Sequence, residues 1–231
     1  MSGYRNSPNR VEPTHTRVLA CATVMEEMSP IIPPAMKYTI LDFGLHIKPD
    51  RLKQELQKEI DKEVAGITTI ILGYGLCSQS VIGLKSANCR VVVPRSDDCI
   101  ALFLGSVEAY KQQHKIAPGT YYLTKGWLKT GGTPFKEYDD FARKYGEAKA
   151  KRITRQILKN YTRLAFINTG KSELDFYHGE AMEIARRFDL QYEEIQGSDA
   201  LVRKMLFGPW DSDFVIAEPG ETISFDDFRK A

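Results

Sequence analysis

Short apolar runs alternate with helical patterns along most of this chain. The runs, which predict strands, cover residues 17–25, 37–43, 67–72, 90–93, 120–123, 163–168, 191–195 and 214–217. Helical spacing is clearest after Pro49, where apolar side chains recur every four residues: Leu52, Leu56, Ile60 and Val64. Alternating strands and helices favour parallel sheets with helices on both faces. We therefore predict an α/β fold with mostly parallel sheets and two Rossmann-like lobes.

The chain of 231 residues is long enough for one domain or two small lobes. Residues 131–134 (GGTP) are its strongest linker signal. We predict a flexible tail at 1–15, an N-terminal α/β lobe at 16–130, a linker with bridging helices at 131–159, and a C-terminal α/β lobe at 160–231. A single continuous sheet is the alternative. Two lobes that face each other would place the strand ends of both at one cleft.

The formal net charge of +2 provides no strong field, so neither nucleic acid nor an anionic membrane is an expected partner. We find no apolar run that approaches the ~20 residues needed to cross a bilayer. The polar start of the chain does not resemble a secretory signal. Four cysteines in a chain of this length do not indicate a disulfide framework. We therefore expect a cytoplasmic protein with reduced thiols.

Three cysteines stand at or near the carboxyl ends of predicted strands. Cys77 follows the run 67–72, Cys99 follows the run 90–93, and Cys21 lies late in the first run. Ligands of open α/β sheets bind outside these strand ends, so we expect the three thiols to converge. Converging thiolates would select zinc or another thiophilic metal. The alternative is that each cysteine is a small buried hydrophobe.

Cys99 is the strongest single candidate. A thiol in the first turn of a helix is exposed to the positive end of the macrodipole, which favours the thiolate. Asp97 and Asp98 oppose this effect, although either could provide an oxygen ligand to a metal. His46 follows the second predicted strand at the same edge, and we include it as a candidate ligand or proton carrier.

Gly73, Tyr74 and Gly75 directly follow the third predicted strand and suggest a dinucleotide-binding loop. That interpretation fails, because Ser78 stands where the third glycine of the fingerprint would be. We instead expect the two glycines to permit a tight turn and a close backbone approach near a bound substrate.

Arg95 would lie at the same edge of the sheet and could clamp a carboxylate or phosphate, although a surface salt bridge is equally consistent with its position. In the second half, Thr169 and Gly170 follow a predicted strand and are candidate substrate-binding residues. These positions predict a small-molecule ligand.

Several motifs resemble those of an uncharacterised bacterial and archaeal family that is known only as a domain of unknown function. They are LGYGLCSQSVIGL (72–84), VPRSDDCIALFLGS (93–106), PGTYYLTKGW (118–127), YTRLAFINTG (161–170), EEIQGS (193–198) and GPWDSDFVIAEPG (208–220). The resemblance extends over nearly the whole chain after residue 16. Members of that family are often encoded beside corrinoid-dependent methyltransferases. The resemblance therefore implies a role in one-carbon or metal-cofactor metabolism, with a corrinoid or methyltransferase protein as a partner.

The family pattern keeps cysteines at Cys21, Cys77 and Cys99. It usually has Cys-Glu where this chain has Cys21-Ala22, and Gly-Asn where this chain has Ser78-Gln79. It usually has His-Asp-Cys where this chain has Asp97-Asp98-Cys99. The three thiols are present here, while a histidine and a glutamate typical of the family are replaced.

The leading hypothesis is a cytoplasmic protein that binds zinc or a similar metal through three cysteines and acts in methyl transfer. A non-catalytic metal carrier or accessory protein is the first alternative. A small-anion-binding module that uses Arg95 is the second alternative.

Overall fold

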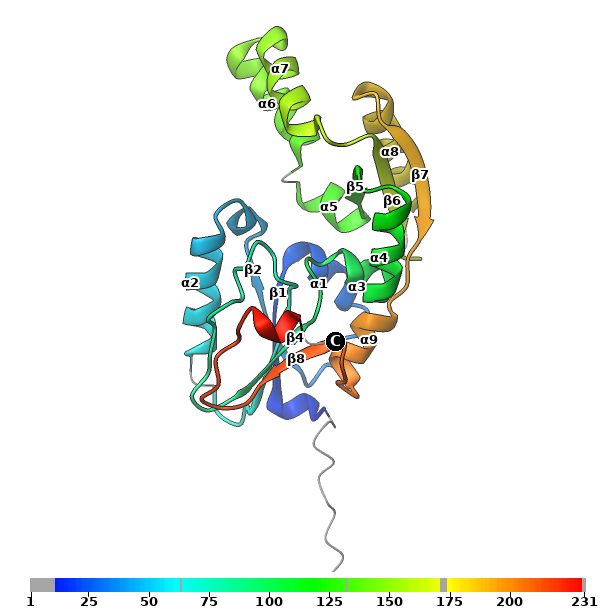
Figure 1. Ribbon diagram of the computed structural model, residues 1–231. Coiled ribbons are helices and arrows are strands. Elements are labelled where there is room, and N and C mark those ends of the chain that lie inside the picture. Colours follow the sequence, from blue (N-terminus) through cyan, green and yellow to red (C-terminus); the bar gives the residue numbers. More distant parts are fainter. Residues whose placement is uncertain (1–10, 63, 132, 171–173, 230–231) are drawn as a thin grey trace, which may run out of the picture. The chain divides into compact units, whose positions relative to one another are not determined.

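A computed structural model describes residues 11–62, 64–131, 133–170 and 174–229 (Figure 1). The chain divides into two compact units, which we call unit 1 (Met1–Val107 with Asp199–Ala231) and unit 2 (Glu108–Ser198). This division differs from the predicted boundaries at 130 and 160. Most of the predicted tail, residues 1–10, lies outside the described residues, and Pro13–His15 forms a short 3-10 turn.

Unit 1 is built on a five-stranded sheet with the order β2-β1-β3-β4-β8. Its strands are β1 (Thr16–Cys21), β2 (Lys37–Leu41), β3 (Thr69–Gly73), β4 (Arg90–Pro94) and β8 (Phe214–Ala217). The first four are parallel, and β8 pairs with β4 in the antiparallel sense. The predicted mostly parallel α/β fold is confirmed.

Four helices and two further 3-10 turns accompany this sheet. They are α1 (Ala22–Met28), the turn Phe43–Ile47, α2 (Pro49–Ile60), α3 (Ile100–Leu104), α9 (Ala200–Phe207) and the turn Asp226–Phe228. Leu52, Leu56 and Ile60 of α2 are buried, as their four-residue spacing predicts. Every residue of β1 is buried, which is the pattern of a strand covered on both faces.

The first strand is shorter than predicted. It ends at Cys21, and the run 17–25 continues as helix α1. Val24, Met25 and Met28 are buried on this helix, at the spacing of a helical face. Burial of that face overrides the strand preference of the small and β-branched residues Ala22, Thr23 and Val24, which lie within the helix. Cys21 is consequently the last residue of β1 and lies at the carboxyl edge of the sheet.

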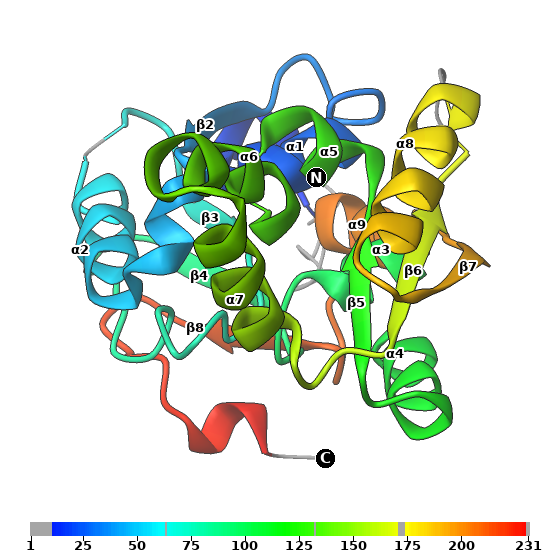
Figure 2. The ribbon, with the colours of Figure 1, turned by 90° about the horizontal axis from the view of Figure 1, so that it is seen from above.

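Unit 2 is built on a three-stranded parallel sheet of β5 (Thr120–Leu123), β6 (Arg163–Asn168) and β7 (Gln191–Gln196). Its helices are α4 (Val107–Ile116), α5 (Lys125–Thr130), α6 (Pro134–Tyr145), α7 (Glu147–Leu158) and α8 (Leu174–Arg187). Figure 2 shows β5, β6 and β7 side by side, with α8 alongside them. Helices α6 and α7 pack on each other and are separated by Gly146, whose φ is 81°.

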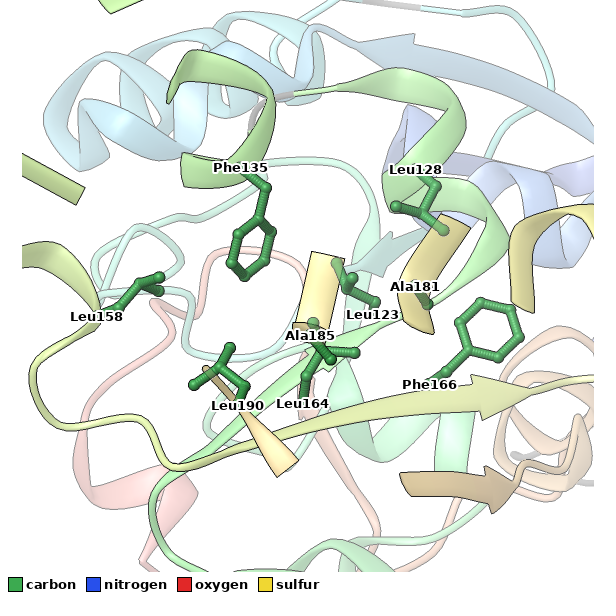
Figure 3. Packing of buried hydrophobic residues seen from close by; sticks show 9 residues of the cluster. All are labelled: Leu123, Leu128, Phe135, Leu158, Leu164, Phe166, Ala181, Ala185 and Leu190. Atoms are coloured by element: carbon green, nitrogen blue, oxygen red, sulfur yellow. The ribbon is translucent and has the colours of Figure 1, made fainter. Parts of the chain in front are cut away.

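The core of unit 2 forms where apolar side chains of β5 and β6 meet those of the surrounding helices. Figure 3 shows the nine buried residues of this cluster, Leu123, Leu128, Phe135, Leu158, Leu164, Phe166, Ala181, Ala185 and Leu190. Arg163 is buried beside the cluster, and its guanidinium reaches Glu193 of β7 (2.6 Å). Within the described residues, we find no helix with the length and apolar character that a bilayer span requires.

Candidate functional site

The loops that follow β3 and β4 run beside each other at the carboxyl edge of the unit 1 sheet. The backbone N–H of Leu76 donates to Ser96 O (2.8 Å), and that of Cys77 donates to Asp97 O (3.0 Å). A Cβ on Gly75 would lie 2.6 Å from Ser96 O. The backbones thus approach more closely than any side chain at this position would allow, as expected from the glycine pair. This approach brings Cys77 and Cys99 to the same place.

Cys21 reaches the same place from the neighbouring strand β1. Ala20 is paired in register with Gly73, so Cys21 is level with Tyr74. Cys21 is buried at 1% exposure and Cys99 at 8%, while Cys77 is half-buried. Each of the three thiols acts electrostatically on Tyr74. The backbone register and these interactions therefore place all three cysteines near Tyr74 at one edge of the sheet.

Burial dominates the acid–base behaviour of the three thiols. The pKa of Cys77 is raised to about 12, mainly by burial; a hydrogen bond to the backbone at Gly75 opposes the rise, and nearby Cys21 and Asp98 contribute to it. Burial also raises the pKa of Cys21 and, together with the neighbouring Cys77, that of Cys99. Cys99 stands at the start of α3, yet its pKa is raised, which is opposite to the effect expected of a helix start. Without a counter-charge, all three groups are neutral thiols near pH 7.

Tyr74 stands among the thiols with its hydroxyl unsatisfied. The side chain is fully buried, and its Oη has no hydrogen-bond partner among the described residues. Burial, followed by the three nearby cysteines, raises its pKa, so the phenol keeps its proton. A buried hydroxyl without a partner costs roughly 1–3 kcal/mol. A ligand or ion-bound group with an acceptor atom would remove that cost.

His46 borders this cluster on the β2 side. Its ring is stacked on that of Tyr74 (centroids 5.7 Å apart) and on that of Phe43 (5.1 Å). Its Nδ1 lies 3.0 Å from Phe43 O, which fixes the ring orientation. Burial lowers the pKa of His46, so the imidazole is neutral near pH 7. His46 therefore lies next to Tyr74, as expected from its place after β2.

The turn that carries Cys77 has an unusual backbone. Cys77, Ser78 and Gln79 are all left-handed, with φ of 44°, 58° and 68°. This conformation costs an L-residue other than glycine roughly 1–2 kcal/mol. The turn thus has three consecutive strained residues, and such strain is concentrated at functional sites.

Replacing Gln79 by glycine should therefore stabilise the protein. We expect Gln79→Gly to raise the free energy of unfolding by about 1 kcal/mol and the thermal midpoint by about 2–4 °C. Thermal denaturation followed by circular dichroism measures the change. Asn88→Gly is the matched control, because Asn88 is exposed and has no positive φ, so that substitution should destabilise. A loss of stability in Gln79→Gly would contradict the strained-turn interpretation.

Other predicted site residues have structural roles at this edge or lie elsewhere. The guanidinium of Arg95 donates to Ser212 O (2.7 Å), to Phe214 O (3.0 Å) and to Asp227 O, so it is bonded to the C-terminal segment. Asp98 Oδ1 accepts from Ile100 N (2.8 Å) at the start of α3.

The remaining predicted residues are spread more widely. Asp97 is exposed. Thr169 and Gly170 belong to unit 2, where Gly170 N donates to Asn168 Oδ1 (2.9 Å). Cys89 directly precedes β4, at the opposite edge of the unit 1 sheet, and its Sγ donates to Ile67 O (3.4 Å).

Ser80 is a site residue that sequence reasoning missed. It follows the strained turn, is 2% exposed, and its hydroxyl has no partner among the described residues. No motif marks it, because its burial results from the packing of the loop. Among the residues described, no group of three or more His, Cys, Asp or Glu side chains is already arranged to hold a metal ion.

Comparison with known protein families matches residues 40–206 to one described as "Protein of unknown function (DUF1638)". Neither the curated proteins nor the solved structures include a match to the chain. The matched segment is more than half of the 231 residues and includes β3, β4 and their loops. The chain belongs to the DUF1638 family.

Proposed function

We propose that unit 1 binds a thiophilic metal ion, zinc in the first instance, through Cys21, Cys77 and Cys99. The observation that carries this proposal is the gathering of three thiols around Tyr74, whose buried hydroxyl has no hydrogen-bond partner within the described part of the chain. Three soft sulfur donors suit zinc, which takes three or four protein ligands. The thiols are not already set at coordinating positions, so metal binding requires their side chains to turn toward one point.

The topology of unit 1 supports a ligand site at this place. Along the chain, β2 is added on one side of β1, and β3 and β4 are added on the other side. The direction in which strands are added therefore reverses between β1 and β3. Open α/β sheets bind their ligands outside the strand ends at such a switch point. Cys21 ends β1, and Tyr74 and Cys77 follow β3, so the cluster lies on both sides of the reversal.

The residues around the thiols have distinct roles in this proposal. Tyr74 keeps its proton and could donate a hydrogen bond to a ligand bound at the site. His46 is neutral and lies against Tyr74, where it can accept a proton from a bound thiol or water. A bound zinc ion would lower the pKa of such a group and make it nucleophilic near neutral pH.

This chemistry suits a cytoplasmic enzyme of one-carbon or methyl-transfer metabolism. The same site also suits a non-catalytic metal carrier or an accessory protein to a corrinoid methyltransferase. Turnover requires an open coordination position beside Tyr74, whereas a carrier requires only the three thiols. We favour the enzyme, because a carrier would not need the buried hydroxyl of Tyr74, for which the described residues provide no hydrogen-bond partner.

Elemental analysis of anaerobically purified protein tests the metal site. We expect about one zinc ion per chain in the wild type and little metal in the Cys77→Ser, Cys99→Ser double variant. Cys89→Ser is the matched control, since that thiol lies at the other edge of the sheet and should leave the metal content unchanged. Absence of metal from the wild type after reconstitution with zinc, or equal loss in Cys89→Ser, would reject the three-thiol site.

A further inference from the structure

A cavity of about 450 Å³ lies in unit 2, lined by residues of α6 and α7 and by residues 187–190. Small-molecule sites typically enclose about 300–1,000 Å³. All of its lining residues fall within Glu108–Ser198, whereas the three clustered cysteines belong to unit 1. A ligand of this cavity would therefore be independent of the proposed metal site.

The charged side chains of the cavity favour an anion. Lys151 and Arg155 lie four residues apart on one face of α7, and neither forms an ion pair with another described residue. Arg187 is the third cation, held by Asp139 (2.8 Å). Asp189 is the acidic residue of the lining, and Asp139 offsets the charge of Arg187, so Lys151 and Arg155 are the cations that favour an anion.

Aromatic rings form much of the remaining wall. Tyr138 and Phe188 meet edge to face with their centroids 5.4 Å apart, and Arg187 covers the Tyr138 ring at 4.6 Å. Tyr161 lines the cavity and keeps 36% of its surface exposed. Walls of this kind bind planar apolar groups by stacking and by edge contacts.

Thr154 provides a separate sign of a missing ligand. It lines the cavity on α7 between Lys151 and Arg155 and is 1% exposed. Its Oγ1 has no hydrogen-bond partner among the described residues. Rotation about χ1 exchanges the hydroxyl and methyl positions of a threonine, and both rotamers occur in helices. Turning this hydroxyl toward a ligand would therefore cost no internal hydrogen bond.

We propose that this cavity binds an organic phosphate that carries a planar ring, the chemical class that includes aryl phosphates and nucleotides. Lys151 and Arg155 bind the phosphate oxygens, and Thr154 donates to one of them. Tyr138, Phe188 and Tyr161 contact the ring.

Isothermal titration calorimetry of the full chain with phenyl phosphate tests this site. We expect saturable binding with one ligand per chain. Arg155→Gln should weaken the affinity about tenfold, because it removes a charged hydrogen bond. Thr154→Val should weaken it about three- to tenfold while leaving thermal stability equal or higher, because no described residue bonds to the hydroxyl.

Two further variants separate this site from a diffuse basic surface. Arg152→Gln changes an exposed cation on the same helix that does not line the cavity, and it should leave the affinity unchanged. Asp189→Asn removes the opposing charge and should strengthen binding. The proposal is overturned by an absence of saturable binding, or by Arg152→Gln weakening the affinity as much as Arg155→Gln. It is also overturned if inorganic phosphate or benzoate binds as tightly as phenyl phosphate.

Discussion

Zinc affinity should rise steeply with pH, by up to about a thousandfold between pH 7 and pH 8. All three thiols have a raised pKa, that of Cys77 being about 12, so they are protonated in the metal-free protein at neutral pH. Each must release a proton to bind the ion. Below its pKa, each thiol therefore contributes up to about a tenfold gain in affinity per pH unit. Competition against a chelator of known affinity, at a series of pH values, measures the slope.

The number of displaced protons gives an internal check on this prediction. Calorimetry in buffers of different ionisation enthalpy should report about three protons per bound ion in the wild type. A Cys99→Ser variant should release about two, with a correspondingly shallower dependence on pH. An affinity that does not change with pH in the wild type would mean that the thiols are not the ligands.

Gly75→Ala should destabilise the protein by about 3 kcal/mol and abolish metal binding. The added Cβ would lie 2.6 Å from Ser96 O and 2.7 Å from Asp98 O. Both obstacles are backbone atoms, so the two loops must separate. Their separation breaks the bond from Cys77 N to Asp97 O and moves Cys77 away from Cys99. Urea unfolding and zinc content measure the two effects on the same preparation.

Gly179→Ala is the control with the opposite sign. Gly179 lies within α8, and an added Cβ meets nothing within 4 Å. We expect a gain of up to about 1 kcal/mol from the better helix propensity of alanine. If Gly75→Ala unfolds at the wild-type urea concentration and retains zinc, the close contact of the two loops has no part in the site.

The positions of the strands along the chain were predicted better than the pairing of strands within each sheet. The strands at 120–123 and 214–217 exist, but the first pairs with β6 in unit 2 and the second with β4 in unit 1. Alternation of strands and helices favoured a different grouping, with 214–217 in the C-terminal lobe. A strand of four residues has no local feature that selects its neighbour, so its partner is decided by packing between distant segments.

The site shows the same limit at the level of single side chains. The sequence indicated that Cys21, Cys77 and Cys99 share one edge, because parallel strands end at the same side of a sheet. It could not indicate that Arg95 is bonded to carbonyls of residues 212, 214 and 227, or that the Tyr74 hydroxyl has no partner among the residues that the structure describes.

The sequence by itself determined the α/β class, the helix Pro49–Ile60 and the ends of β3 and β4, which Cys77 and Cys99 follow. These depend on apolar periodicity and on turn residues, which act over a few positions of the chain. Only the tertiary structure decided the return of β8 to the first sheet, the start of α1 directly after Cys21, and the burial of Tyr74. Those features depend on contacts between residues far apart in the chain, whose free energy no local pattern encodes.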